Sequence, residues 1–453
     1  MLSQLMQKSF FSESRILLAL SIPLIMSGLV ETSIGFFSNI FLAHLGTDNL
    51  AAGALVNWVF TTIMVIVWGT LSAITTLVAR HYGRKNLTEI QNVLCAGLIL
   101  AAVLMLPSMI LLWNLSPIFL LLGQNPKTVL LGKPYLHGLT WAVIPDFIYT
   151  VAMQFVAGLG RTKINMCFSL LFVPLCIFFN YALVFGAFLF PKLGIAGIGW
   201  GTAFAFWIIA GLFTAYFFLK KDLRIYLKFR SIPKITAALK EIFQVGLPLG
   251  LMYSVEIGFF LAMTILMGLI NQATLSANQV TLQFFWIFSI ATFALAQGIT
   301  IRVGHSVGRN DKKAVHYATY VGLFYSFIYT ILVTLFYWKY PNTLIGVDFN
   351  LHNRENTTII HLAKDFLAVA ALVQIVEAIR FTYFGSLRGL KDTKFSLLNS
   401  ILIFWLTALP LACFSTSLGF AGQGIWWATL FGEIIGIPLL IWRYHRKVNE
   451  YLF

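Results

Sequence analysis

Charged residues are scarce in this chain. Only 10% of its 453 residues are Asp, Glu, Lys or Arg, against about 25% in an average soluble domain. In their place, 59% of the residues are hydrophobic, and the mean hydropathy is +0.85. This composition excludes a soluble globular domain and predicts an all-α polytopic membrane protein.

Other absences narrow the function. No GxxxxGK[ST] motif is present, so the chain has no nucleotide-hydrolysing motor of its own. The four cysteines fall inside apolar segments without metal-ligand spacing. With no soluble domain to hold an active site, we expect neither an enzyme nor a cofactor. The first fifteen residues lack an apolar signal-peptide core, so the first span should itself direct insertion.

Twelve apolar segments are long enough to cross a bilayer, which takes about 20 residues per helix. Continuous apolar runs indicate helices, because lipid-exposed strands would alternate. The segments cover roughly 15–43, 50–79, 88–113, 132–158, 165–190, 195–219, 239–270, 276–301, 314–338, 358–387, 395–416 and 422–442.

Lysine and arginine are distributed unequally between the two sides of these spans. With both termini on one side, that side holds 24 of them and the other side 5. Cytoplasmic loops carry such an excess. The net charge of +15 therefore indicates membrane topology, not nucleic-acid binding. We expect both termini in the cytoplasm and the chain, as a monomer surrounded by lipid, in a bacterial inner membrane.

The two halves of the chain resemble each other. Pro23 precedes Glu31 by eight residues, as Pro248 precedes Glu256, and both pairs are offset by 225. GRKN at 83–86 matches GRND at 308–311 at the same offset. Six spans per half give both halves the same orientation, as in transporters built from parallel repeats. We expect an N-lobe (1–219), a basic linker with a short helix (220–238) and a C-lobe (239–453).

Four acids lie deep within the predicted spans: Glu31, Asp146, Glu256 and Glu377, the second and fourth paired at an offset of 231. An ionisable group at the bilayer centre costs a few kcal/mol, so it usually faces a bundle interior or a wet cavity. Such acids can carry a proton, a metal cation or a cationic compound. Structural alternatives stay open: Arg380 is placed to pair with Glu377 on one helical face, and Asp146 could bond backbone groups freed by a neighbouring proline.

Other polar and proline residues are candidates for substrate binding and for bending. Pro23 and Pro248 each leave a carbonyl unpaired one turn back, so either could bend its helix or merely mark an early turn. Aromatic side chains could bind flat cations through cation–π contacts. The candidates for substrate contact are Tyr253, Asn278, Gln279, Gln283 and Gln374, together with Asp146.

Five stretches resemble the MATE (multidrug and toxic compound extrusion) family, most closely its NorM-like branch. They are VGLPLGLMYSVE (245–256), SANQV (276–280), GITIRVGHSVG (298–308), GSLRGLKD (385–392) and the paired GIAG and GFAG loops. The resemblance covers nearly the whole chain. It implies two six-helix lobes around a V-shaped central cleft, and export of amphipathic, often cationic drugs in exchange for sodium ions or protons.

By position, the resemblance implies cation coupling, with sodium as one possible ion, at Glu256 and Glu377. Many relatives have aspartate in place of Glu377, and also where this chain has Ser38. Glu31, two turns before Ser38, could substitute for that missing acid. We therefore expect coupling mainly in the second lobe. The alternatives are a lipid or polysaccharide flippase, which should line its cleft with basic residues, and a channel or receptor without coupled transport.

Overall fold

The computed structural model describes residues 2–121, 123–227 and 232–451, and it is helical almost throughout that part of the chain. Twelve helical segments in the described ranges are long and apolar enough to cross a membrane, as predicted from the sequence. Each of the twelve predicted segments overlaps one of them. The span that follows residue 392 is assembled from two helices joined by a π-helical stretch, Ile401–Ala408.

Contacts divide the chain into two compact units, which we call the N-terminal unit (Met26–Gly250) and the C-terminal unit (Leu251–Phe453 together with Met1–Ile25). The N-terminal unit holds the second part of α1 (Leu2–His44), the first part of α10 (Ile232–Ile270) and the elements between them. These are α2 (Thr47–Leu71), α3 (Ala73–Gly83), α4 (Leu87–Trp113), α5 (Leu115–Leu121), α6 (Pro126–Gly158), α7 (Thr162–Phe185), α8 (Ala196–Leu219), α9 (Lys221–Arg224) and η1 (Ile225–Leu227).

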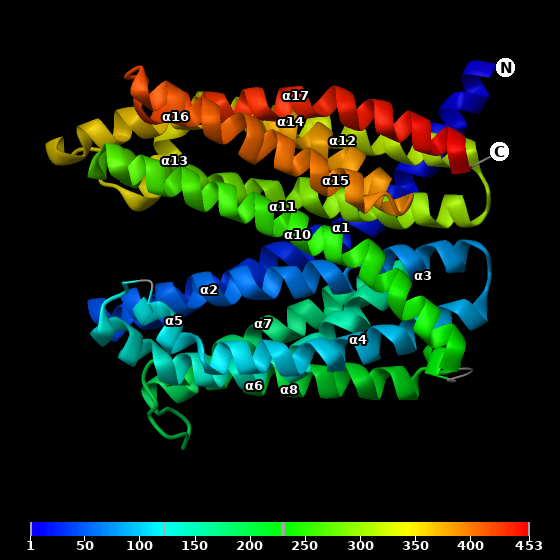
Figure 1. Ribbon diagram of the computed structural model, residues 1–453, viewed down its shortest axis with the longest axis horizontal. Helices are drawn as coiled ribbons and strands as arrows, with labels where there is room; N and C mark the ends of the chain where they lie inside the picture. Colours follow the sequence, from blue (N-terminus) through cyan, green and yellow to red (C-terminus); the bar gives the residue numbers. More distant parts are fainter. Residues whose placement is uncertain (1, 122, 228–231, 452–453) are drawn as a thin grey trace. The chain divides into compact units, whose positions relative to one another are not determined.

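The C-terminal unit holds the remaining elements. These are α11 (Gln272–Gly308), α12 (Lys312–Lys339), α13 (Pro341–Asp348), η2 (Arg354–Asn356), α14 (Thr357–Gly389), α15 (Thr393–Ser400), η3 (Ile401–Ala408), α16 (Leu409–Ser417) and α17 (Ala421–Tyr451). Within each unit the long helices run side by side (Figure 1). In the C-terminal unit, α14 packs along α11, α12 and α17, which makes it the central helix.

The unit boundaries fall inside two helices, not in the basic linker between residues 219 and 239 as expected from the sequence. α1 changes unit after Ile25 and α10 after Gly250, in each case two residues beyond a repeated proline. Close helix packing accounts for this division. A Cβ atom on Gly250 would lie 2.2 Å from the carbonyl oxygen of Ile66, so the start of α10 packs tightly against α2.

The start of α1 is joined to the C-terminal unit by charge as well as by packing. Arg302 on α11 donates two hydrogen bonds to Glu13, at 2.5 and 2.7 Å from its Nε and Nη2 atoms. Both side chains are almost fully buried. One turn before Arg302, Gly298 faces Ser21 of α1, where an added Cβ would meet the hydroxyl at 2.1 Å. The first 25 residues therefore belong structurally with the second half of the sequence.

The structure places the predicted linker helix and the two repeated prolines within the helices named above. The short helix expected to lead into the seventh span is the first part of α10, which begins at Ile232, and α9 and η1 precede it in the linker. Part of the linker, 228–231, lies outside the described residues. Pro23 and Pro248 both lie inside continuous helices. Their role as bends stays a prediction.

The repeated GRKN and GRND motifs form the same turn in the two units. Lys85 and Asn310 each adopt a left-handed conformation, with φ of 56° and 57°. The next residue caps the following helix: the side chain of Asn86 accepts from the Glu89 amide, and that of Asp311 from the Ala314 amide. Such caps satisfy amides that the first helical turn leaves unpaired. The internal repeat is thus present in the local structure as well as in the amino-acid sequence.

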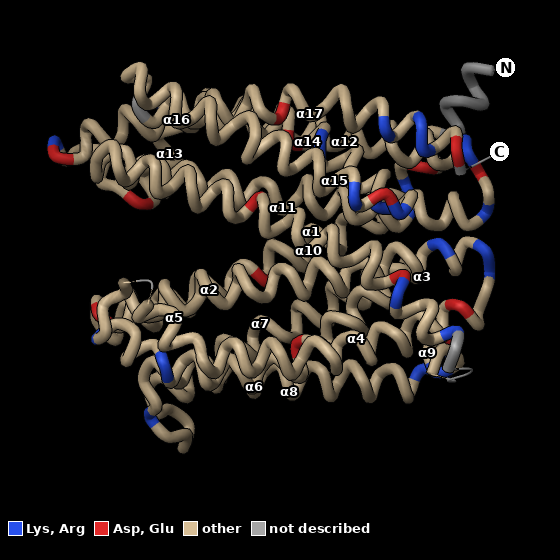
Figure 2. Tube along the Cα trace, in the orientation of Figure 1, with Lys and Arg blue, Asp and Glu red and all other residues tan. Residues whose placement is uncertain are grey.

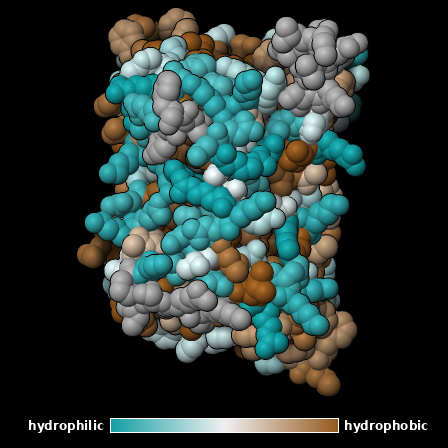
Figure 3. Space-filling view, turned by 90° about the vertical axis from the view of Figure 1, so that its right-hand side faces the viewer, coloured by the Kyte–Doolittle hydropathy of each residue, from teal (hydrophilic) through white to brown (hydrophobic). Residues whose placement is uncertain are grey.

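In each unit taken by itself, Lys and Arg gather at one end of the helices, while Asp and Glu also occur midway along them (Figure 2). The end of the molecule that Figure 3 presents is covered largely by hydrophilic side chains. This is the distribution that membrane insertion requires.

Candidate functional site

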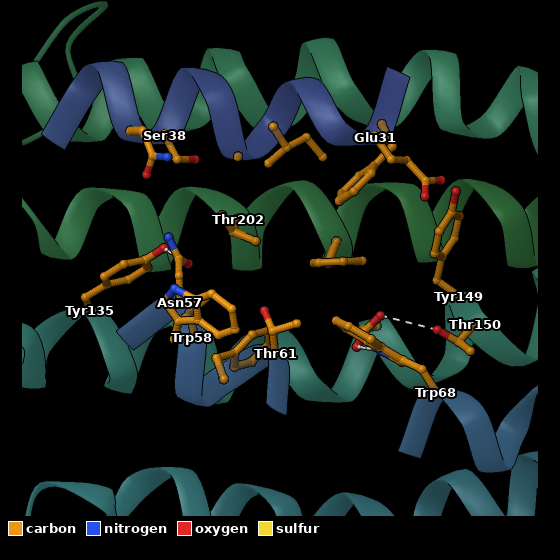
Figure 4. Close-up of a pocket in the computed structure, with 18 of the residues that line it drawn as sticks. Glu31, Ser38, Asn57, Trp58, Thr61, Trp68, Tyr135, Tyr149, Thr150 and Thr202 are labelled. Carbon is orange, nitrogen blue, oxygen red and sulfur yellow. Dashed lines mark hydrogen bonds between the residues drawn. The ribbon is translucent and has the colours of Figure 1, made fainter. Parts of the chain in front are cut away.

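The N-terminal unit contains a cavity of about 700 Å³ whose lining comes from α1, α2, α6, α7 and α8. Glu31 and Asp146 both line it, and none of the described lining residues is Lys, Arg or His. Aromatic rings form much of its wall (Figure 4). They are Trp58, Phe60, Trp68, Tyr135, Tyr149, Phe172 and Phe206. The cavity therefore combines two acids with flat apolar surfaces.

Glu31 is accessible from this cavity. Its side chain is exposed although it lies deep in a membrane-spanning helix. The Ser169 hydroxyl on α7 donates to its Oε1 atom at 2.5 Å, and the Tyr149 hydroxyl points toward the same carboxylate (Figure 4). No basic side chain offsets its charge among the described residues of the cavity lining. Glu31 can therefore take up a proton or a cation from the cavity.

Asp146 lies on α6 and is 4% exposed. The indole Nε1 of Trp68 donates to its Oδ2 atom at 2.8 Å, and the Thr150 hydroxyl donates to its Oδ1 atom at 3.3 Å. Its described hydrogen bonds thus come from side chains on α2 and α6, not from backbone groups freed by Pro145. Asp146 also lines the same cavity as Glu31. The two acids therefore belong to one candidate site.

Ser38 lines the same cavity as Glu31, seven residues further along α1. Two other polar side chains of the lining have bonded partners: Tyr135 donates to Asn57 at 2.8 Å, and Thr202 donates to Asn180 at 3.4 Å. The resemblance implies an aspartate at position 38 in many relatives. Glu31 supplies a carboxylate to the same cavity from the same helix.

The C-terminal unit places its acids around one arginine. We call Glu256, Glu377, Arg380 and Glu433 the arginine cluster. Arg380 donates from Nη1 to Glu256 Oε1 at 2.5 Å. Its Nη2 lies 3.6 Å from Glu377 Oε1, and its Nε lies 3.3 Å from Glu433 Oε1. All four side chains are at most 8% exposed.

Serine hydroxyls complete the bonding of two of these acids. Ser289 on α11 donates to Glu377 Oε2 at 2.7 Å, and Ser400 at the end of α15 donates to Glu256 Oε1 at 3.2 Å. The predicted intrahelical pair between Arg380 and Glu377 is present, but it is the longest of the three contacts that Arg380 makes with carboxylates. A buried guanidinium with several carboxylates makes a strongly interacting group.

Sequence reasoning missed Glu433, which lies on α17 and is 1% exposed. No acid of the first half lies at the corresponding position, so the internal repeat gave no indication that Glu433 belongs to a site. A different signal was available: Glu433 stands alone in the apolar segment FGEIIG. An acid inside a predicted span is the same criterion that selected the other four.

The polar residues predicted to bind substrate do not form one group. Asn278 and Gln374 are buried: Asn278 accepts from Trp426 Nε1 at 3.2 Å, and Gln374 donates to the Phe285 carbonyl at 3.0 Å. Both bonds join helices of the C-terminal unit. These contacts favour a packing role for the two amides.

Three further candidates are more accessible. Gln279 and Gln283 are exposed on α11, and Tyr253 is half-buried on α10 near Arg388. All five amide and tyrosine candidates belong to the C-terminal unit, whereas Asp146 lies in the N-terminal unit. Substrate contact at these positions stays a prediction.

Twelve helices long and apolar enough to span a membrane lie in the described part of the chain, and acids are buried inside both units, so the fold is that of an integral membrane protein. The chain belongs to the MatE family, whose model matches residues 23–182 and 248–414. The two matched segments begin at the two repeated prolines. The family expected from sequence motifs is thus confirmed.

Curated relatives of similar length support this assignment. The chain is 30% identical over 446 residues to a probable multidrug resistance protein NorM of Pseudomonas aeruginosa, covering 97% of this chain and 91% of that one. It is 31% identical to the protein of the same name from Brucella suis, covering 96% and 93%. A Synechococcus protein with this name is 28% identical, covering 96% and 94%.

Solved structures show the same fold. The eukaryotic MATE transporter AtDTX14 has a TM-score of 0.86 at 17% identity, covering 98% of this chain and 99% of that one. An outward-facing multidrug resistance MATE family transporter of the MOP superfamily has a TM-score of 0.87 at 16% identity, covering 97% and 96%. The structural relatives are transporters, and none of these comparisons indicates a catalytic activity.

Proposed function

We propose that the protein is a secondary active multidrug efflux antiporter. It exports amphipathic or cationic organic compounds in exchange for sodium ions or protons, by alternating access of two lobes, and uses no cofactor. The names of the NorM relatives and the family membership support efflux of drugs. The excess of basic residues on one side supports cytoplasmic termini in a bacterial inner membrane.

The main structural support for this proposal is the cavity of the N-terminal unit. It holds two acids, no basic side chain among its described lining residues, and seven aromatic rings. An aromatic face attracts a cation most strongly where water is excluded. A carboxylate without a basic partner attracts any cation that enters. Glu31 and Asp146 can therefore bind either the exported compound or the coupling ion. If the compound and the ion compete for these acids, one is released when the other binds, and their transport alternates.

The acids of the C-terminal unit form the second proposed coupling site. Glu256 and Glu377 are buried in membrane-spanning helices, and such residues commonly belong to ion pathways. Their charge is partly balanced by Arg380, whereas that of Glu31 and Asp146 is not. We therefore assign binding of the organic cation to the N-terminal cavity.

A flippase for lipid-linked sugars or polysaccharides is the alternative. A substrate with a phosphate group calls for basic side chains around it. The charged residues among the described lining of the cavity, Glu31 and Asp146, are both acids. This observation favours a cationic substrate over an anionic one.

The test uses the full chain reconstituted into liposomes, with a fluorescent cationic dye and an imposed sodium or proton gradient. Gradient-driven dye movement supports the proposal, and the gradient that works identifies the ion. Glu31→Gln and Asp146→Asn should each lower the rate at least tenfold. Asp48→Asn is the matched control, because Asp48 is an exposed acid of the same unit, paired with Lys127 at 2.7 Å. Dye movement without either gradient would contradict antiport.

A further inference from the structure

Arg380 occupies the centre of the arginine cluster. Its three nitrogen atoms each face a different carboxylate, from α10, α14 and α17. One oxygen atom of each acid, Oε1, is directed toward the guanidinium. A metal ion bound between these acids would compete with the guanidinium for these oxygen atoms, because hard cations take several oxygen ligands from different directions.

The guanidinium is also held in place by aromatic rings. Its central carbon lies 4.7 Å from the ring centre of Phe381, 5.2 Å from that of Phe384 and 5.0 Å from that of Phe404. Phe404 belongs to the π-helical stretch, a type of local irregularity that is frequent at functional sites. Arg380 itself is 1% exposed. An arginine stays charged and stacks well on aromatic faces, so this position holds a permanent cation.

The surroundings contain polar atoms that Arg380 does not satisfy. Among the described residues, Glu433 Oε2 is buried and has no hydrogen-bond partner, and the same holds for both side-chain polar atoms of Asn399. Asn399 precedes the Ser400 that bonds Glu256, and its Nδ2 lies beside Gly436, one turn beyond Glu433. Buried polar atoms are normally paired, so these mark a site with unused ligand capacity. Oxygen atoms of this kind could complete the shell of a metal ion if the guanidinium were absent.

We propose that Arg380 is a tethered cation that takes the place of a transported sodium ion in the C-terminal unit. The inference rests on the proposed function, and it names Arg380 as the residue that determines which ion the arginine cluster can bind. Glu256, Glu377 and Glu433 then bind no sodium while Arg380 is present, since a metal ion would have to displace the guanidinium or sit beside its fixed charge. A proton needs no ligand shell, and this geometry does not exclude it. Sodium, where the transporter uses it, binds in the N-terminal unit.

The test measures equilibrium binding of radioactive sodium to the purified full chain in detergent, without any transport step. Wild type is compared with Glu433→Gln, Arg380→Gln, Arg380→Lys and the double variant Arg380→Gln with Glu433→Gln. We expect Glu433→Gln to leave sodium binding at the wild-type level. Arg380→Gln should gain a saturable sodium signal that the double variant loses. Arg380→Lys keeps the positive charge and should show no gain.

Two results would overturn the inference. One is a loss of wild-type sodium binding on Glu433→Gln, since Glu433 would then be a sodium ligand beside Arg380. The other is a folded, monodisperse Arg380→Gln variant that gains no sodium. Where Arg380→Gln does not fold, the comparison of wild type with Glu433→Gln decides alone. Failure of dye transport by wild type would refute the proposed function without changing these binding results.

Discussion

Arg380 makes its shortest contact with Glu256, 124 positions away in the sequence, and not with Glu377 on its own helix. The distances are 2.5 Å between Nη1 and Glu256 Oε1 and 3.6 Å between Nη2 and Glu377 Oε1. The arginine therefore joins α14 to α10, and through Glu433 also to α17. One buried guanidinium thus faces carboxylates from three helices of the C-terminal unit.

Replacing Arg380 should destabilise the protein. Arg380→Gln leaves three buried carboxylates without their counter-charge, and breaking a buried ion pair costs about 3–5 kcal/mol. Thermal unfolding of the purified protein in detergent measures this, with Arg380→Lys as the control that keeps the charge. Added sodium should restore part of the lost stability of Arg380→Gln, because a ligand that binds only the folded state stabilises it. An unchanged unfolding temperature for Arg380→Gln would refute the importance of these ion pairs.

Glu256→Gln should abolish gradient-driven efflux. The substitution keeps the shape of the side chain but removes the carboxylate that Arg380 and Ser400 both contact. Dye efflux from cells that lack their own pumps provides the measurement. Glu355→Gln serves as the control, because Glu355 is an exposed acid of the same unit. Efflux that persists at the wild-type rate in Glu256→Gln would show that Glu256 has no coupling role.

Glu31 should supply the carboxylate that the resemblance would place at position 38, seven residues later. Glu31→Gln is expected to lose coupled efflux, and adding Ser38→Asp in the same chain is expected to restore part of it. Both positions line the same cavity, so a carboxylate at either can reach the same ion. Initial efflux rates of the single and double variants test this. If Ser38→Asp rescues nothing in a folded protein, the two positions are not equivalent.

Trp68 should hold Asp146 in place. Trp68→Phe keeps an aromatic ring but removes the indole donor, which leaves a buried carboxyl oxygen unpaired at a cost of about 1–3 kcal/mol. Trp58→Phe is the matched control, because Trp58 lines the same cavity with 52% of its surface exposed. Unfolding temperature and dye affinity report on the two variants. Equal effects of the two substitutions would argue against a special role for the bond to Asp146.

Gly250 should tolerate no side chain. A methyl group there would meet the backbone oxygen of Ile66 at 2.2 Å, and overpacking of this kind costs about 1–3 kcal/mol. Gly211→Ala on α8 is the control, since no atom of the described residues lies within 4 Å of an added Cβ. Alanine in that open helical position should instead stabilise by about 0.5–1 kcal/mol. Thermal unfolding distinguishes the two, and a neutral Gly250→Ala would place the tight α2–α10 contact in doubt.

The acids within spans could be recognised from sequence, but of their partners only Arg380, three residues after Glu377 on the same helix, could. Glu31, Asp146, Glu256 and Glu377 stand out because each is polar in an apolar run, which is a local signal. The pairing of Arg380 with Glu256 and Glu433 depends on how three helices are rotated about their axes. The hydrophobic pattern does not specify that rotation, since most faces of these helices are apolar.

By itself the sequence determined the number of spans, the internal repeat and the family. These depend on runs of about 20 apolar residues and on short turn motifs, and both are properties of contiguous segments. The tertiary structure decided which unit each half-helix joins, that Glu31 and Asp146 share a cavity without a basic residue in its described lining, and that Arg380 stands among three acids. Those features arise from contacts between helices far apart in the chain, where close approach at glycines and the pairing of buried charges select one packing among many.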